Sequence, residues 1–216
     1  MSSARPCILV TSFEPFGGSA VNPTMEVARL LVKSPCAIGS RISITLPVVT
    51  GERAGSAWAT FLPLLESMRP DAVVALGENA KADRVHFERV AINLRDARIA
   101  DNAGVQLSDT TVIEGAPNAH FATLPLRAML TACESAGVPA QLSLSAGTFL
   151  CNELMFRLLN GAPCAAAGFV HIPQLPEQAA VRGGPSMDAE TTARGVHAAL
   201  EVLARAIMQP TTEQRA

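Results

Sequence analysis

Residues 140–161 read AQLSLSAGTFLCNELMFRLLNG, and this stretch predicts a β-strand that passes into an α-helix. Residues 140–145 alternate apolar and polar side chains, which is the period of a strand. Apolar residues then recur at helical spacing, at Leu154, Met155, Leu158 and Leu159. Gly161 follows as a stop signal. The stretch therefore indicates an α/β fold and places Cys151 in the first turn of a helix.

Cys151 has a local setting that favours a reactive thiol. Unpaired N–H groups and the positive end of the helix dipole stabilise a thiolate there, and the thiolate is the nucleophilic form of cysteine. The alternative is a buried cysteine that packs as a small hydrophobe, and this reading is the better one for any single cysteine of the five taken alone. The local pattern leaves both readings open.

The rest of the chain alternates predicted strands and helices, which indicates one domain with a mainly parallel or mixed sheet covered on both faces. Strands are expected at residues 7–12, 41–48, 71–76, 88–94 and 167–172. A first helix is expected to begin at Pro23, with Asn22 as its N-cap. Further helices are expected over residues 52–68, 126–135 and 186–208. Pro63 is expected to kink or split the 52–68 helix, and Ser186 is expected to cap the last one. Residues 78–123 are less regular, 173–185 are expected as loop or broken helix, and 209–216 as a frayed tail.

Composition and charge narrow the class of protein. The 216 residues are 49% hydrophobic and 17% charged, as in an ordered globular domain. The net charge is −2 with Lys and Arg scattered, so no nucleic-acid partner is expected. No stretch approaches a membrane span or a signal peptide, so we expect a cytoplasmic protein without a membrane partner. The five cysteines are widely spaced with no CxxC pair, which argues against disulfides and a zinc site.

Cysteine chemistry needs a base and an orienting group behind that base. His171 is the preferred candidate base among four histidines, because it ends a predicted buried strand, where open α/β sheets carry their ligands. A satisfied core histidine is an equally good reading of His171. His86 also stays open as a candidate, whereas His120 and His197 have nothing in the sequence to single them out.

Glu88 is a candidate orienting acid. It opens a predicted hydrophobic strand with Arg89 beside it, so a solvated strand end paired with arginine is the favoured interpretation of the local sequence. A buried carboxylate bonded to His171 would instead fix the ring tautomer, as in a catalytic triad.

The loop Phe13-Glu-Pro-Phe16-Gly-Gly follows the first predicted strand. Its paired glycines resemble a phosphate cradle, but it lacks both GxGxxG and a P-loop lysine. Phe13 and Phe16 are therefore either core residues or the walls of a flat apolar pocket.

Taken together, these stretches resemble the pyroglutamyl peptidases, or pyrrolidone-carboxylate peptidases, a family of cysteine peptidases. The resemblance rests on four motifs in family order: FEPFGG with Asn22-Pro23, ERVAINLRDARIADN from Glu88 to Asn102, SAGTFLCN at Cys151, and GFVHIPQLPEQ around His171. It covers nearly the whole chain.

The resemblance implies an open three-layer α/β/α sandwich with a mixed, mostly parallel sheet, commonly assembled as tetramers or dimers. It implies hydrolytic removal of an amino-terminal pyroglutamyl residue from peptides through an acyl-enzyme, without metal or cofactor. Cys151 would be the nucleophile, His171 the base and Glu88 the orienting acid. The substrate pocket would include Phe13, Phe16, Asn22, the residue at position 78, Ile99 and Phe149, with Arg98 assisting the backbone in holding the oxyanion.

Residues 77–82 read GENAKA, where the family usually has GQAGGR. An ionised Glu78 can accept a hydrogen bond from the lactam N–H but cannot donate one to the lactam carbonyl. Two other functions therefore stay open: a non-catalytic small-ligand binding protein on the same fold, and an amidase with shifted specificity.

Overall fold

A mixed six-stranded sheet forms the centre of the molecule, in the order β2-β1-β3-β8-β4-β7. The computed structural model describes residues 5–209. The strands are β1 (Cys7–Phe13), β2 (Ser40–Leu46), β3 (Ala72–Glu78), β4 (Val85–Glu88), β7 (Ala140–Ser143) and β8 (Ala166–Ile172). Neighbouring strands are parallel except β4 and β8, which pair antiparallel. The predicted mixed, mostly parallel sheet is confirmed.

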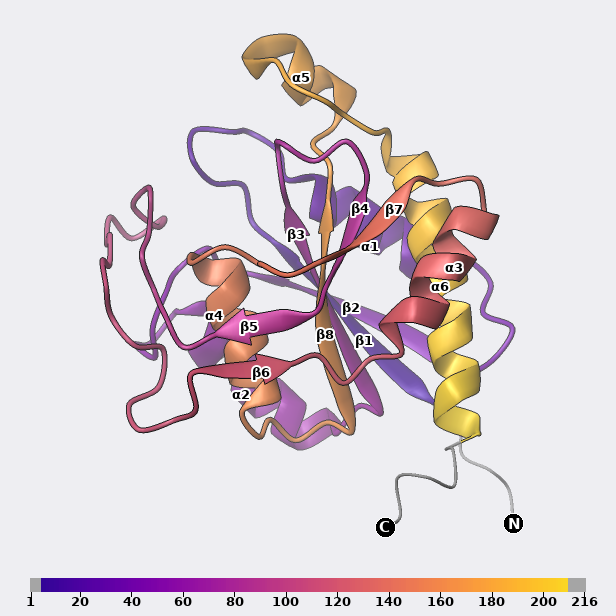
Figure 1. Cartoon of the computed structure of the whole chain (residues 1–216), viewed down its shortest axis with the longest axis horizontal. Coiled ribbons are helices and arrows are strands. Elements are labelled where there is room, and N and C mark those ends of the chain that lie inside the picture. The colour runs from indigo at the N-terminus through magenta and orange to yellow at the C-terminus, as the bar shows by residue number, and fades with distance from the viewer. Residues whose placement is uncertain (1–4, 210–216) are drawn as a thin grey trace.

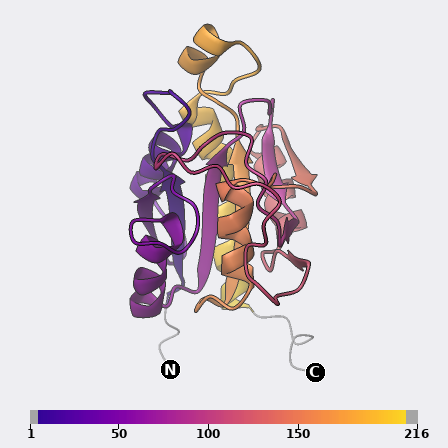
Figure 2. The ribbon, with the colours of Figure 1, turned by 90° about the vertical axis from the view of Figure 1, so that its left-hand side faces the viewer.

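Helices cover both faces of this sheet (Figures 1 and 2). One layer contains α1 (Pro23–Lys33), α3 (Leu126–Ser135) and α6 (Ala189–Met208), and the other contains α2 (Ala57–Met68) and α4 (Leu150–Leu159). The short helix α5 (Pro176–Arg182) follows β8 and projects beyond the end of the sheet. Two short strands, β5 (Val90–Ile92) and β6 (Ala119–Phe121), form a separate antiparallel pair.

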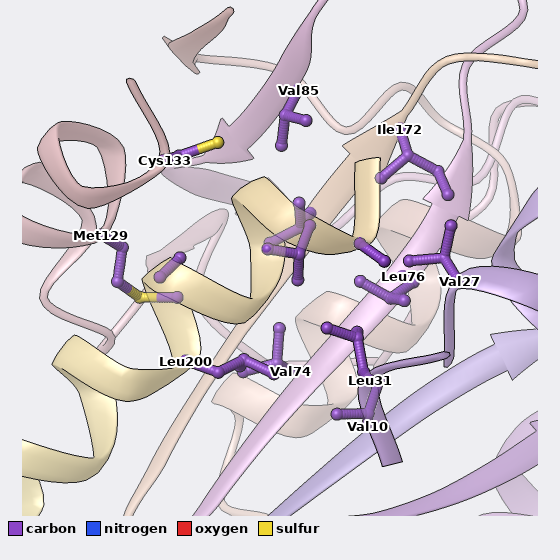
Figure 3. Packing of buried hydrophobic residues seen from close by; sticks show 14 of the residues in the cluster. Val10, Val27, Leu31, Val74, Leu76, Val85, Met129, Cys133, Ile172 and Leu200 are labelled. Atoms are coloured by element: carbon purple, nitrogen blue, oxygen red, sulfur yellow. The ribbon is translucent and has the colours of Figure 1, made fainter. Parts of the chain in front are cut away.

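Each face of the sheet has its own hydrophobic core. Figure 3 shows part of one of them, in which strand residues Val10, Val74 and Leu76 pack against Leu31 of α1 and Leu200 of α6. All five are buried. Burying a side chain of this size contributes about 1.5–3 kcal/mol to the stability of the folded state. The packing on both faces of the sheet therefore holds in place the strand ends that carry the site.

The first helix begins as the sequence predicts. The side chain of Asn22 accepts a hydrogen bond from the Thr24 N–H at 3.1 Å, and Pro23 takes the first helical position, where its missing N–H costs nothing. Asn22 also donates to the Glu14 carbonyl at 3.0 Å, so the cap ties α1 to the loop after β1.

Of the expected kink or split at Pro63, the split is wrong, because α2 is continuous through this residue. Pro63 is exposed, so water can reach the carbonyl that loses its partner, while Phe61 and Leu65 hold the helix by their burial. The helix begins at Ala57 with Ser56 as its cap, five residues later than expected.

Three further expectations differ from the structure. Residues 88–94 are not one strand: Glu88 ends β4 in the large sheet, whereas Val90–Ile92 pair with β6. The cap of α6 is Asp188, whose carboxylate accepts from the Thr191 N–H at 2.7 Å, rather than Ser186. Residues 176–182, expected as loop or broken helix, form α5. Of the expected frayed tail, residues 210–216 lie outside the described part.

Within residues 5–209, no helix is long and apolar enough to cross a membrane. The same residues contain no group of three or more His, Cys, Asp or Glu side chains arranged to hold a metal ion.

Candidate active site

Cys151 lies in the first turn of α4, one residue after its start. The end of β3 packs directly against it: a Cβ added at Gly77 would lie 3.0 Å from the Cys151 Sγ and 2.5 Å from a ring carbon of Phe169. Only a glycine fits at this point of β3 without displacing the thiol or the ring. The thiol is thus set at the carboxyl ends of the central strands, where α/β sheets form their sites.

His171 lies near the end of β8, and its Nδ1 is 2.9 Å from Oε1 of Glu88. Glu88 ends the neighbouring strand β4, which runs antiparallel to β8 and pairs Glu88 with Phe169 across the ladder. The carboxylate is completely buried and His171 is 6% exposed. Because Nδ1 is held by Glu88, the other ring nitrogen, Nε2, is the one available to the Cys151 thiol.

The protonated form of His171 is favoured in this setting. Burial by itself lowers the pKa of an imidazole, but the charge of Cys151, hydrogen bonds to Cys151 and Glu88, and the charge of Glu88 outweigh burial and raise the pKa of His171 to about 10. The Phe169 ring lies 4.9 Å from the imidazole, centre to centre, and shields one side of it. The site therefore favours an imidazolium at His171, beside the Cys151 sulfur.

A small cavity of about 20 Å³ opens on one side of Cys151. Five of its walls are residues expected to bind substrate: Phe13, Phe16, Asn22, Glu78 and Phe149. Val48 and Leu150 complete it. We call this cavity the aromatic slot. Its surface is almost wholly apolar, with Glu78 and Asn22 as the polar side chains.

A wider cleft of about 430 Å³ opens on the other side of Cys151 and includes His171. Arg98 and Ile99 line this cleft rather than the aromatic slot. The loop that carries them is held by Asn102, whose amide donates to the Pro15 carbonyl at 2.9 Å. Residues 95–102 and the loop at 13–18, distant in sequence, thus form facing sides of one site.

Glu78 ends β3 and lines both the slot and the cleft. Its side chain is 2% exposed and forms an ion pair with Arg182, while Gln178 donates to its Oε2 at 3.4 Å. Burial raises the pKa of Glu78, and the charge of Arg182 together with both hydrogen bonds works against that rise. The carboxylate is thus tied to α5.

The other histidines do not enter the site. His86 lies opposite His171 in the strand ladder, but its Nε2 accepts from the Gln141 amide at 2.9 Å and it lines neither the slot nor the cleft. His120 bonds to Asn160, and His197 to Arg41.

Four residues of the site were not singled out from the sequence. Asn152 is buried next to Cys151 and bonds to the backbone of Ile92 and Leu94, which fixes the start of the 93–102 loop. Its position directly after the cysteine, in a predicted first turn, was the available signal. Gly77, Gln178 and Arg182 gave no comparable signal, since their roles arise from contacts between distant segments.

The site combines a thiol at the start of a helix, a buried imidazole beside it, and a carboxylate that orients the imidazole. In an α/β protein this arrangement is typical of hydrolases that use a cysteine nucleophile. Comparison with known proteins also gives a cysteine hydrolase, and it identifies the family within that class. A family model described as pyroglutamyl peptidase matches residues 7–206.

Two curated relatives are similar over nearly their whole length. Pyrrolidone-carboxylate peptidase 1 of Ralstonia nicotianae is 42% identical over 205 residues, covering 93% of this chain and 94% of its own. Pyrrolidone-carboxylate peptidase of Gloeobacter violaceus is 46% identical over 204 residues, covering 91% and 96%.

Solved structures show the same similarity. Pyroglutamyl peptidase I of Bacillus amyloliquefaciens has a TM-score of 0.87 at 32% identity and covers 92% of this chain and 95% of its own. Pyrrolidone carboxyl peptidase of Pyrococcus furiosus has a TM-score of 0.86 at 35% identity, covering 93% and 99%. The chain belongs to the pyroglutamyl peptidase family of cysteine peptidases.

Proposed function

We propose that this protein removes the pyroglutamyl residue from the amino terminus of peptides, with Cys151 as nucleophile, His171 as acid and base, and Glu88 as the group that orients His171. The observation that carries the assignment is the 2.9 Å bond between His171 and Glu88, next to a thiol that stands between an aromatic slot and an open cleft.

The aromatic slot suits the pyroglutamyl ring. The ring is flat and uncharged, because its amine is closed into a lactam, so Phe13, Phe16 and Phe149 can bury it without an unpaired charge. Asn22 and Glu78 stand at the polar edge, and Glu78 accepts the lactam N–H. An amino acid with a free ammonium group would lose its hydration in this slot and is excluded.

In the acylation step the Cys151 thiolate attacks the pyroglutamyl carbonyl carbon, and the new S–C bond leaves a negative oxygen. The N–H groups of residues 150–152 open α4 and have no partner within the helix, so they point at the place where this charge develops. Arg98, on the facing loop, adds a positive charge to the same region.

The C–N bond then breaks, and His171 gives its Nε2 proton to the leaving amine. The neutral imidazole next takes a proton from water, whose oxygen attacks the thioester carbon. Pyroglutamic acid leaves, Cys151 returns to the thiolate and His171 to the imidazolium. Glu88 holds the Nδ1 proton throughout, so the ring keeps one orientation through both steps.

Release of a chromophore from a pyroglutamyl amide tests the assignment. We expect turnover by the wild-type enzyme and a loss of at least about 10³-fold in Cys151→Ala, because Cys151 is the only cysteine among residues 5–209 that lines the slot or the cleft. Cys164→Ala, at a half-buried cysteine outside the slot and the cleft, serves as the control and should keep its activity. Retained turnover in Cys151→Ala would exclude the mechanism.

We propose further that the chain acts as one peptidase domain in the cytoplasm and assembles as a homotetramer or a homodimer, with no nucleic-acid or membrane partner. Two large apolar side chains support assembly: Phe121 is 67% exposed and Leu144 is 68% exposed. Light scattering should give a mass of four or two chains. A monomer at micromolar concentration would contradict this proposal.

A further inference from the structure

The direction in which the peptide leaves the site follows from the two openings beside Cys151. The aromatic slot contains Cys151 but not His171, whereas the wide cleft contains both. The leaving amine receives its proton from His171 and must lie on that side. The residues that follow pyroglutamate therefore occupy the wide cleft, a conclusion that rests on the proposed function.

The wide cleft has an unbalanced charge. Its lining includes three basic side chains, Lys81, Arg98 and Arg182, and one carboxylate, the buried Glu78. Arg182 and Glu78 form an ion pair, so their charges cancel. Cys151 and His171 add no net charge in the thiolate–imidazolium form. Two positive charges remain, on Lys81 and Arg98.

These two side chains are available to a ligand. Both are exposed, and neither forms an ion pair with any residue between 5 and 209. The nearest acids in the sequence are engaged elsewhere: Asp83 pairs with Arg84 at 2.7 Å, and Asp96 accepts from the Ser108 hydroxyl at 2.7 Å. Neither Asp83 nor Asp96 lines the cleft.

We propose that Lys81 and Arg98 make this enzyme select peptides with an acidic residue among the first two positions after the pyroglutamyl group. Lys81 follows β3 and Arg98 lies in the 93–102 loop, so the two cations belong to separate segments of the same cleft. An acidic side chain there gains a favourable interaction, and a basic one meets like charge. Lys81 is a specificity-determining residue and takes no part in bond breaking.

The test compares peptides that differ in one charge. Pyroglutamyl-X-alanine and pyroglutamyl-alanine-X, with X as Glu, Gln or Lys, are made as carboxyl-terminal amides, which removes the terminal carboxylate. We expect kcat/KM to be roughly two- to fivefold higher for Glu than for Gln in at least one series, since exposed pairs are individually weak, and lower still for Lys. The ratio should fall toward one at about 0.5 M salt, because exposed charges are screened.

Charge reversal assigns the effect to a residue. Lys81→Glu should reduce or invert the Glu-to-Gln ratio, and Lys81→Gln should lower it by a smaller amount. Lys33→Glu changes the net charge equally, but Lys33 lies exposed in the last turn of α1, outside the slot and the cleft, so this control should keep the wild-type ratio. A ratio within one enzyme does not depend on the fraction that is folded.

The outcomes separate the two proposals. Turnover of all the peptides with no Glu-to-Gln preference at low salt, or a preference that Lys81→Glu leaves unchanged, overturns the inference while the peptidase assignment stands. A wild-type enzyme that cleaves none of the peptides, nor the chromogenic pyroglutamyl amide, overturns the peptidase assignment and the inference with it.

Discussion

His171 and Glu88 lie 83 residues apart in the chain, and Nδ1 of His171 is 2.9 Å from Oε1 of Glu88. The pair forms because β4 lies antiparallel beside β8 and places Glu88 opposite Phe169, which is two residues before His171 and on the same face of β8.

Glu88→Gln tests the orienting role of this carboxylate. The amide removes the charge that favours the imidazolium, so we expect kcat for a pyroglutamyl amide to fall by about 10² to 10⁴ with a smaller change in KM. Glu201→Gln is the matched control: Glu201 is also a buried carboxylate, ion-paired with Arg41 far from Cys151. It should lose stability but keep its kcat. Equal losses of kcat in both variants would indicate a structural role for Glu88.

The protonation of His171 can be followed directly. Its pKa is raised to about 10, in part by the charge of Cys151, so the ring is expected as imidazolium at neutral pH and kcat/KM should decline on the alkaline side, near pH 10. Cys151→Ser removes the thiolate and should lower the pKa of His171, as measured by ¹⁵N NMR of the imidazole. An unchanged pKa in this variant would show that the thiol and the ring do not interact.

Gly77→Ala tests the close approach of β3 to the nucleophile. The added Cβ would lie 3.0 Å from the Cys151 Sγ and 2.5 Å from the Phe169 ring, so one of them must move. Gly168→Ala is equally crowded, at 2.6 Å from a Leu124 methyl carbon, but lies away from the thiol. Both should lose about 1–3 kcal/mol of stability. Only Gly77→Ala should lose kcat/KM, by roughly tenfold or more. A normal kcat/KM in Gly77→Ala would show that the added methyl group does not displace the Cys151 thiol from its reactive position.

Glu78→Gln tests how the slot reads the lactam. A glutamine can accept from the lactam N–H or donate to the lactam carbonyl, whereas the carboxylate only accepts, so KM should fall in the variant. Burial raises the pKa of Glu78, so the wild-type KM should decrease as the pH is lowered, because the protonated carboxyl gains an O–H donor while its other oxygen still accepts, and the variant should lose this dependence. Glu177→Gln, at an exposed residue of α5, should behave as wild type. A higher KM in Glu78→Gln would mean that the carboxylate itself is needed.

The cysteines should differ in their reaction with iodoacetamide near pH 7. Burial raises the pKa of Cys133 to about 12 and that of Cys164 to about 11, so neither forms much thiolate. Cys151 stands beside a protonated imidazole and should be alkylated first, as mass spectrometry of digested protein would show. A pyroglutamyl ligand should slow this reaction. Uniform slow labelling of all cysteines would contradict an activated thiolate.

Several elements follow from sequence because their signals are local. Alternation and helical spacing located β7 and α4, and the Asn22-Pro23 cap located the start of α1. Residues 85–92 were not predictable in this way. The hydrophobic run that includes Glu88 has the pattern of one strand. In the structure Glu88 ends β4, and Val90–Ile92 join a separate sheet. The strands that lie next to each segment decide where the run divides, and those neighbours are distant in sequence.

By itself, the sequence determined the α/β alternation, the place of Cys151 in a helix's first turn, and the family motifs, because each depends on residues close together in the chain. The tertiary structure decided whether Glu88 meets solvent or His171, since burial of a charge depends on which strands become neighbours. It also decided that Glu78 is paired with Arg182, 104 residues away, and that Lys81 and Arg98 face one cleft with no ion-pair partner among residues 5–209. Charge balance in a site is set by distances in space, and a linear pattern does not contain those distances.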